Sequence, residues 1–349
     1  MKSDSKIRPA LFSVLSQLNT QKTTMPLEMQ TALNELNDAA LYTGAKIFQL
    51  NKLEEAERFL NIAAATGNAW SQFALATCGA YRDGIWHHKN GEVTSHASDD
   101  TKKWLRLAAA QNYIPALIQL GDAQSLEKAK GLLTNPASQE NPQGMYYMYL
   151  ITNDTHWLEK SAAVGWNQAQ YKLAQLYQQK PEIFSNDTLR HARIEELLQA
   201  SADGGLPLAV HARVFSDESN ASFAEKQSRL AQLAWMGQVY GMLEYGYALA
   251  NFARAQKDAS RYAPGERQAP RTYGLAKDLG LAYAMLKYVL KKTAEVEEVP
   301  MLASDLHAIE MQMTQMDWEK ANTTLTQLAE KAIEPFSRLE ELIIPGTAK

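Results

Sequence analysis

The densest group of possible metal ligands in this chain of 349 residues lies between residues 83 and 100. It contains three histidines and four carboxylates: His87, His88, His96, Asp83, Glu92, Asp99 and Asp100. Zinc accepts both kinds of ligand, but structural zinc sites need four ligands in tetrahedral geometry, and adjacent histidines rarely bind one ion. We therefore expect no metal site in this segment, and we interpret it as a loop that is solvated or contacts a partner.

The rest of the sequence contains no recognisable catalytic group. The single cysteine, Cys78, follows the run Phe-Ala-Leu-Ala-Thr on an expected helix, so we expect a buried, unreactive thiol. The sequence has no glycine-rich phosphate loop, no His-Glu-x-x-His, no Gly-x-Ser-x-Gly and no Cys-x-x-Cys. We expect no catalytic residue, no bound cofactor and no enzymatic activity.

Aromatic and arginine side chains, which dominate the energetics of protein interfaces, are the candidates for contact with a partner. Trp70, Tyr113, Trp166 and Tyr240 stand beside expected inter-helix turns, either as partly buried edge residues or as interface anchors. With the two adjacent histidines included, the candidate partner-binding residues are Trp86, His87, His88, Trp166, Tyr240, Arg261, Tyr262, Arg267 and Arg271. Other aromatics occupy expected core positions: Tyr81, Trp104, Trp157 and Tyr177.

Charge is unevenly distributed near the C-terminus. Residues 252–292 hold nine Lys or Arg and three acids, whereas residues 293–349 hold eleven acids and four bases. The whole chain has a net charge of −4, and no Lys/Arg stripe recurs from repeat to repeat, so we expect no nucleic-acid partner. Two interpretations of the basic segment stay open: it attracts an acidic partner, or it docks on the acidic C-terminal helices.

The elements that must position these residues follow a repeated pattern. Five units align on a turn position: Gly67, Asn112, Gly165, Gly205 and Gly237. A leucine stands seven residues before each turn: Leu60, Leu105, Leu158, Leu198 and Leu230. A small residue stands four residues after each turn: Ser71, Ala116, Ala169, Ala209 and Gly241. Gly or Asn ends a helix in the left-handed conformation, and small residues let two helices approach to about 8–10 Å, so each unit predicts a hairpin of two helices.

The turn positions are separated by 45, 53, 40 and 32 residues, a period typical of helical solenoids. The alternation Trp-Leu-x-x-Ser-Ala-x-x-Gly-x-x-x-Ala-x-x-x-Leu-x-x-x-Tyr at residues 157–177 resembles the Sel-like repeat (SLR), a relative of the tetratricopeptide repeat. The resemblance covers residues 50–295. The fourth and fifth units depart from it, because Arg213 and Tyr245 replace the leucine of the second helix.

We therefore predict an all-α fold, a right-handed α-solenoid of stacked antiparallel helix hairpins with helical caps at both ends. The predicted parts are an N-terminal cap at 1–50, the solenoid of about six units at 51–295 with an insert near 255–275, and a C-terminal cap at 296–349. An additional hairpin is expected at 124–153 and a sixth unit from Leu279. Expected helix caps are Asp99 or Asp100, and Asn186 or Asp187.

The resemblance implies a non-enzymatic protein-binding module whose partner is another protein. Bacterial SLR proteins include immunity proteins that neutralise secreted phospholipase effectors, such as those of type VI secretion, and scaffolds for envelope assembly or signalling. Divergent repeats favour one dedicated partner, so an immunity-type inhibitor that sterically blocks a toxin is the leading expectation. The alternatives are a scaffold or adaptor, a receptor for cell-wall fragments, and a hydrolase of envelope polymers.

Hydropathy and the N-terminal residues bear on location. No run of residues is long and apolar enough for a transmembrane helix, so a chain that is not transmembrane is expected. The start Met1-Lys-Ser-Asp-Ser-Lys-Ile-Arg lacks the apolar stretch of a signal peptide. The expected location is the periplasm if a signal segment has been removed, and the cytoplasm otherwise; the sequence does not define the oligomeric state.

Overall fold

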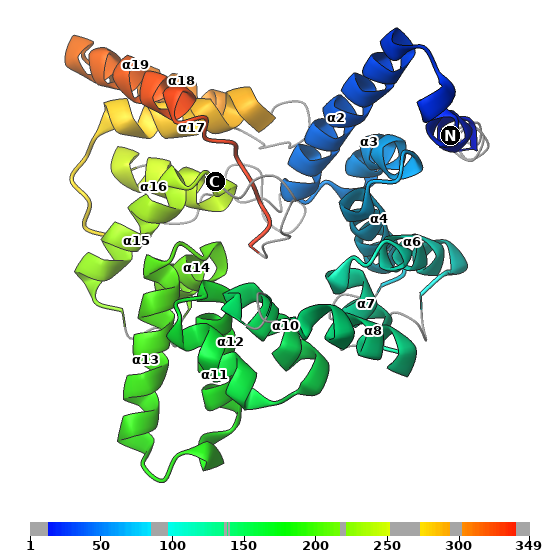
Figure 1. The fold of residues 1–349 in the computed structure, drawn as a ribbon. Helices are drawn as coiled ribbons and strands as arrows, with labels where there is room; N and C mark the ends of the chain where they lie inside the picture. Colours follow the sequence, from blue (N-terminus) through cyan, green and yellow to red (C-terminus); the bar gives the residue numbers. More distant parts are fainter. Residues whose placement is uncertain are drawn as a thin grey trace. The chain divides into compact units, whose positions relative to one another are not determined.

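The computed structural model of the chain describes residues 13–84, 97–135, 138, 140–216, 221–251, 273–293 and 302–339. These residues form α-helices joined by short connections, with no strand among them (Figure 1). The chain divides at Val164 and Gly165 into two compact units. None of the described helices is long and apolar enough to cross a membrane.

The first unit is a succession of helices, each packed against the next along the chain. Its helices are α2 (Leu27–Gln49), α3 (Leu53–Ala65), α4 (Ala69–Arg82), α6 (Asp99–Ala110), α7 (Ile114–Leu120), α8 (Ala123–Leu133), α10 (Pro142–Thr152) and α11 (Thr155–Ala163). Residues 22–24 form a short 3-10 helix before α2. Helices α8 and α10 are the additional hairpin expected at 124–153, which accounts for the longest spacing between repeats.

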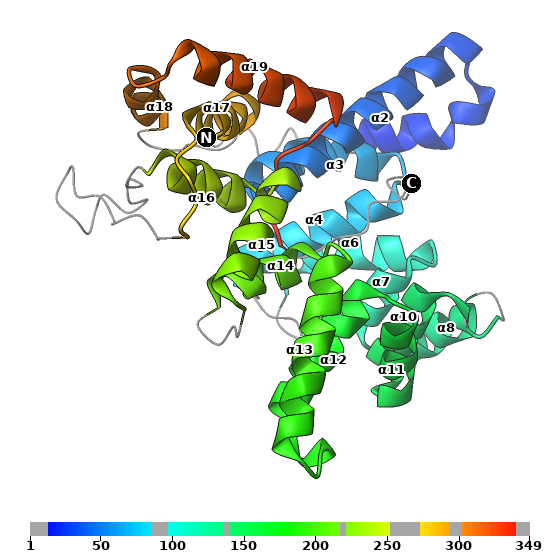
Figure 2. The same ribbon diagram turned by 90° about the vertical axis from the view of Figure 1, so that its left-hand side faces the viewer.

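Within the second unit, shown from another direction in Figure 2, successive helices also pack against one another, except that α19 packs against α17. Its helices are α12 (Asn167–Gln179), α13 (Asp187–Asp203), α14 (Pro207–Phe215), α15 (Phe223–Trp235), α16 (Val239–Ala250), α17 (Leu279–Thr293), α18 (Leu302–Glu310) and α19 (Gln315–Glu330), with a 3-10 turn at Pro181–Ile183. Helix α17 begins at Leu279, as expected for a sixth unit. The all-α fold of helix hairpins is confirmed, whereas the domain boundaries at residues 50 and 295 stay predictions.

The turn positions have the predicted backbone conformation. Positive φ angles occur at all five: 93° at Gly67, 63° at Asn112, 92° at Gly165, 79° at Gly205 and 90° at Gly237. The small residues after the turns are all buried, and a Cβ atom added at Gly241 would stand 2.7 Å from Cγ of Leu233. The repeat register is therefore correct at the helix crossings, where a larger side chain would push two helices apart.

The leucine position is buried in four of the five units. Leu60, Leu105, Leu158 and Leu230 have no exposed surface. Leu198 is half-buried instead, because α13 buries its neighbours Ile194, Leu197 and Ser201. Ser201 and Ala202, four and three residues before the turn, are buried as in the other units, so the repeat register holds and only the leucine position differs, with Leu197 in the core in place of Leu198.

Other expectations were partly wrong. Trp104 and Tyr177 are buried as predicted and Trp157 is half-buried, but Tyr81 is 38% exposed because it lies in the last turn of α4, one residue before the helix ends. Cys78 is buried as expected. Asn186 caps α13, whereas α6 is capped by Ser98 and not by Asp99 or Asp100, which lie in its first turn.

Residues 333–336, which follow α19, contact the turn between α15 and α16 and also helix α17. The backbone carbonyl of Phe336 accepts a 2.8 Å hydrogen bond from the N–H of Val239, and the N–H of Phe336 donates a 2.9 Å hydrogen bond to the carbonyl of Gly237. The hydroxyl of Tyr288, on α17, donates to the carbonyl of Ile333 at 2.8 Å. Lys292 and Glu334 add an ion pair at 3.2 Å. The turn between α15 and α16 is therefore held from outside by the chain that follows α19.

Candidate functional site

Most of the predicted partner-binding residues lie outside the described part of the chain. These are Trp86, His87, His88, Arg261, Tyr262, Arg267 and Arg271. Trp166 and Tyr240 are described, and both are half-buried at the start of a second helix, Trp166 before α12 and Tyr240 on α16. Trp70, which also follows a turn, is only 1% exposed and packs edge-on against Phe48, so it belongs to the core.

Tyr240 belongs to a cluster of rings on two neighbouring second helices. Its ring lies 5.0 Å from that of Phe215 at 73° and 6.2 Å from that of His211. His211 and Phe215, one turn apart on α14, are 4.6 Å from each other. All three side chains are half-buried. We call these three residues the α14–α16 aromatic cluster.

Helix α14 has two different faces, which explains how the cluster reaches the surface. Val210 and Val214 are buried, and Ala209 is the small residue at the helix crossing. Leu208 and Phe215 are half-buried and pack against the apolar core formed by Ala202, Leu206, Ala209, Val210 and Leu233. One face of α14 thus fills the core, while His211 and Phe215 keep part of their ring surface in solvent, Phe215 at the edge of that core.

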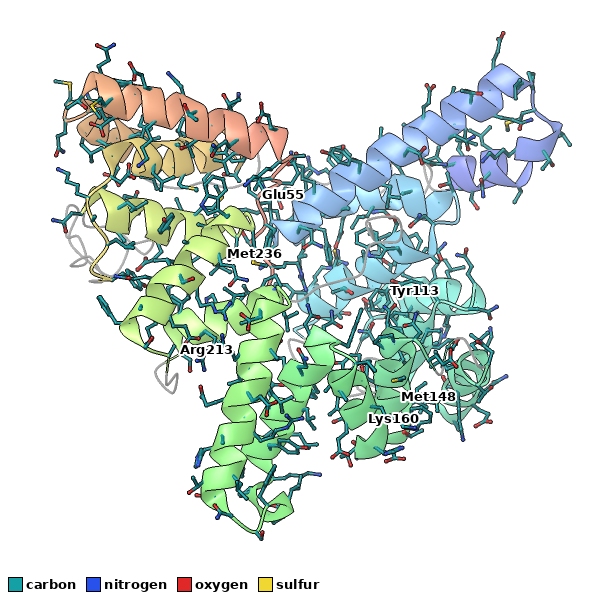
Figure 3. The ribbon with its side chains drawn as sticks, turned by 60° about the vertical axis from the view of Figure 1, so that its left-hand side comes forward. Glu55, Tyr113, Met148, Lys160, Arg213 and Met236 are labelled. Atoms are coloured by element: carbon teal, nitrogen blue, oxygen red, sulfur yellow. The ribbon has the colours of Figure 1, made fainter. Side chains whose placement is uncertain are left out.

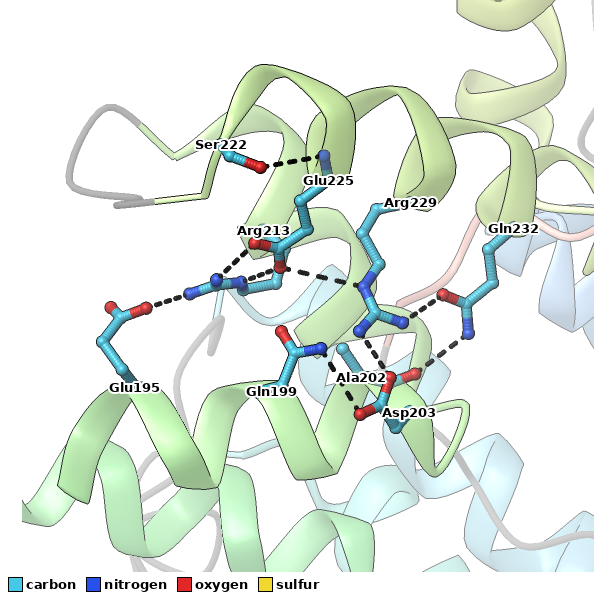
Figure 4. Close-up of polar contacts among 9 residues, drawn as sticks. All are labelled: Glu195, Gln199, Ala202, Asp203, Arg213, Ser222, Glu225, Arg229 and Gln232. Atoms are coloured by element: carbon cyan, nitrogen blue, oxygen red, sulfur yellow. Dashed lines mark hydrogen bonds and ion pairs between the residues drawn. The ribbon is translucent and has the colours of Figure 1, made fainter. Parts of the chain in front are cut away.

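Arg213 holds α14 in place from the buried face. Only 5% of Arg213 is exposed. Its guanidinium donates to both carboxylate oxygens of Glu225 on α15, at 2.8 and 2.9 Å, and to Glu195 on α13 at 2.5 Å (Figure 4). Burial alone would lower the pKa of Arg213, but hydrogen bonds and charge from the two glutamates outweigh burial and raise it.

Arg229 extends this network along α15. It forms ion pairs with Asp203 at 2.5 Å and with Glu225 at 3.9 Å, and it donates to the side chain of Gln232 at 2.7 Å (Figure 4). Gln232 in turn donates to the carbonyl of Ala202 at 3.0 Å, at the end of α13. The two arginines therefore fix α13, α14 and α15 relative to one another, and so fix the helix that presents His211 and Phe215.

The first unit has two half-buried tyrosines, Tyr113 and Tyr147, with the buried ring of Phe73 beside Tyr113. Tyr113, labelled in Figure 3, lies 5.4 Å from Phe73 of the preceding second helix, α4. Burial raises the pKa of Tyr113, and the nearby hydroxyl of Tyr147 on α10 raises it further. The hydroxyl of Tyr147 accepts a 2.9 Å hydrogen bond from Gln143. These rings combine apolar area with hydroxyl and amide groups, as protein interfaces do.

The sequence identified Tyr113 and Tyr240 but not their neighbours. His211, Phe215 and Tyr147 were missed because each stands away from a turn and none occupies a repeat position. The spacing of His211 and Phe215, four residues apart on one helix face, was the available signal. The described residues contain no group of three His, Cys, Asp or Glu side chains arranged to hold a metal ion.

Comparison with known proteins returned solved structures only. No family model and no curated protein matches the chain. A protective antigen present in uropathogenic Escherichia coli strains, which displays an SLR fold, is 15% identical over 99% of this chain and 89% of that chain, with a TM-score of 0.30. A Sel1 repeat protein from Oxalobacter formigenes is 16% identical over 86% of this chain and 93% of that chain, with a TM-score of 0.31. Sequence identities and TM-scores this low support neither the placement of a site nor the choice of a function.

Proposed function

We propose that this chain is a helical repeat protein that binds another protein through half-buried rings on its second helices. The observation that carries the proposal is the α14–α16 aromatic cluster, in which His211, Phe215 and Tyr240 contact one another and keep part of their surface in solvent. Rigid aromatic side chains give much contact area at a low cost in conformational entropy.

The ion network beneath the cluster supports the same proposal. Arg213 and Arg229 hold α13, α14 and α15 in one arrangement, so the rings on α14 do not have to be ordered when a partner binds. Less free energy is then lost to ordering during association. A binding surface on packed helices is also placed more accurately than one on loops.

Affinity capture from the native organism tests the proposal. We expect the intact chain to retain a specific protein, and the double substitution Phe215→Ala with Tyr240→Ala to lose it while the helical circular dichroism stays unchanged. Tyr42→Ala is the matched control, because Tyr42 is an aromatic residue, 62% exposed, on α2. Equal capture by all three proteins would rule out this cluster as the binding surface.

A finer proposal concerns the partner. We infer that the partner is a secreted bacterial effector enzyme, with a phospholipase as the first candidate, whose active site the chain blocks sterically. The support is the resemblance of residues 157–177 to the Sel-like repeat together with the divergence of the fourth and fifth units, where Arg213 and Tyr245 replace leucine. A scaffold or adaptor role is the alternative within the same class.

Co-expression separates the two roles. If the chain is an immunity protein, it should rescue bacterial growth when a phospholipase effector from the same gene neighbourhood is produced in the same cells, and it should inhibit that enzyme in stoichiometric amounts. Rescue should fall with Phe215→Ala and Tyr240→Ala. A captured partner that has no enzymatic activity would favour the scaffold role and leave the general binding proposal intact.

A further inference from the structure

The turn between α18 and α19 is unusually rich in methionine. Residues 311–316 read Met-Gln-Met-Thr-Gln-Met, so six residues hold three of the twelve methionines in the chain. Met311 is 76% exposed and Met316 is 79% exposed, while Met313 is half-buried. Apolar side chains with this much exposed surface contribute little to the core, so packing within the second unit does not explain Met311 or Met316.

The polar residues of the same turn all have structural contacts. The amide of Gln312 donates to the carbonyl of Ala308 at 3.0 Å and accepts from Lys277 at 3.3 Å. Thr314 and Asp317 form a capping box at the start of α19. Gln315 donates to Glu319 at 3.2 Å. The residues without such an explanation are the methionines.

The backbone of the turn is already ordered by hydrogen bonds. The N–H groups of Met311 and Met313 donate to the carbonyls of His307 and Glu310, each at 3.1 Å. Trp318 follows in the first turns of α19, and its ring lies 5.1 Å from that of Tyr283 on α17. The backbone of this turn is therefore ordered, and each of the three side chains has three rotatable bonds by which the position of its sulfur can adjust.

Sulfur is the feature that distinguishes these three side chains from other apolar side chains of similar size. The turn has no leucine, isoleucine or valine, which a purely apolar contact surface would use equally well. Thioethers are soft ligands that select Cu(I) over hard cations such as Mg²⁺ and Ca²⁺. We propose that Met311, Met313 and Met316 form a site for a soft monovalent cation, Cu(I), coordinated by their three sulfurs. The site is independent of the α14–α16 aromatic cluster.

A thioether carries no proton at any ordinary pH, whereas imidazole and thiol ligands must lose theirs before they bind a metal. Binding of Cu(I) at this turn therefore releases no proton, and its affinity stays constant between about pH 5 and pH 8, the range in which histidine titrates. This independence of pH separates the proposed site from ligation by His307, which lies one turn before Met311 on α18.

The test uses Cu(I) titrated anaerobically against a competing chromophoric chelator, with Ag(I) as an analogue that does not change oxidation state. All proteins carry Cys78→Ala, so that no thiol competes. The site variant is Met311→Leu with Met313→Leu and Met316→Leu, which keeps side-chain volume and removes the sulfurs. The control is Met25→Leu with Met29→Leu, which removes two methionines from the segment before α2 and its first turn.

We expect one equivalent of Cu(I) or Ag(I) to bind the parent protein and the control alike, and the affinity of the site variant to fall by about tenfold or more. In spectra of protein with ¹³C-labelled methionine methyl groups, the resonances of Met311, Met313 and Met316 should shift and that of Met29 should stay in place. Equal affinity in the site variant, unshifted resonances at the turn, or an affinity that rises steeply with pH would each overturn the proposal.

Discussion

At the position where the third repeat has the buried Leu173, the fourth has Arg213. An arginine can occupy this core position only because Glu195 and Glu225 reach it from the helices on either side. The pairing could not be predicted from the sequence, since the partners are 18 and 12 residues away and nothing in the repeat pattern marks them. What the sequence did show was that the leucine was missing.

This pairing predicts the outcome of removing the arginine. Arg213→Leu should destabilise the protein by about 1–3 kcal/mol, because Glu195 and Glu225, only 32% and 22% exposed, lose the guanidinium of Arg213, which leaves Glu225 only its longer ion pair with Arg229. Adding Glu195→Gln and Glu225→Gln should recover part of the lost stability, since the leucine then fills a repeat position with no unpaired carboxylate beside it. Urea denaturation of the single and triple variants measures both effects. A single variant as stable as the parent protein would show that the network contributes nothing.

The small residues at the helix crossings give a second prediction at this scale. Ala169 and Ala209 have no exposed surface, so Ala169→Leu or Ala209→Leu should destabilise by about 1–3 kcal/mol through overpacking. Ala329→Leu, at an exposed position on α19, is the control and should change the melting temperature little. If both core variants melted like the parent protein, the helix crossings would tolerate bulk.

At the scale of elements, the hairpins could be predicted from the sequence because their turns require Gly or Asn. A positive φ selects Gly or Asn, and all five predicted turn positions have one. The α14–α16 aromatic cluster could not be predicted from the sequence, because its residues lie on two helices and contact one another only when those helices pack. Local chemistry is visible in a sequence, whereas contacts between helices far apart in the chain depend on the packing of the whole unit.

The basic insert near 255–275 is the element whose role stays a prediction, because its residues up to 272 lie outside the described part of the chain. Its downstream end is fixed: the hydroxyl of Tyr273 donates to Glu244 at 3.1 Å, and the backbone N–H of Asp278 donates to Leu249 at 3.0 Å. If the insert binds an acidic partner, charge reversal at Arg261, Arg267 and Arg271 should weaken capture of that partner, increasingly so at low salt, and leave the melting temperature unchanged.

The competing interpretation gives the opposite result for the same variant. If the insert docks on the acidic C-terminal helices, charge reversal should lower the melting temperature, and capture measured well below that temperature should be unaffected. Measuring both quantities on one preparation therefore distinguishes a binding loop from a structural one.

At the scale of the molecule, most helices within each unit pack mainly on their neighbours in sequence, α19 on α17 being an exception, so stability should be nearly the sum of repeat and nearest-neighbour terms. We predict that Ala209→Leu raises amide hydrogen exchange in α13, α14 and α15 much more than in α3 and α4. Uniform acceleration along the whole chain would instead indicate a single cooperative unit.

Chelation gives a further test at this scale. EDTA should change neither the melting temperature nor partner capture, because the histidine segment at 83–100 is not expected to hold zinc. A melting temperature that falls on addition of EDTA and recovers with Zn²⁺ would contradict this expectation.

The Arg213 network also limits how such a chain can change its length. Its charges come from three consecutive helices, with Glu195 on α13, Arg213 on α14 and Glu225 on α15. A hairpin inserted between any two of them, by gene duplication or by protein engineering, would separate the arginine from a glutamate that it needs. The fourth repeat is therefore a fixed junction, and lengthening or shortening of the array without loss of stability has to occur on either side of it.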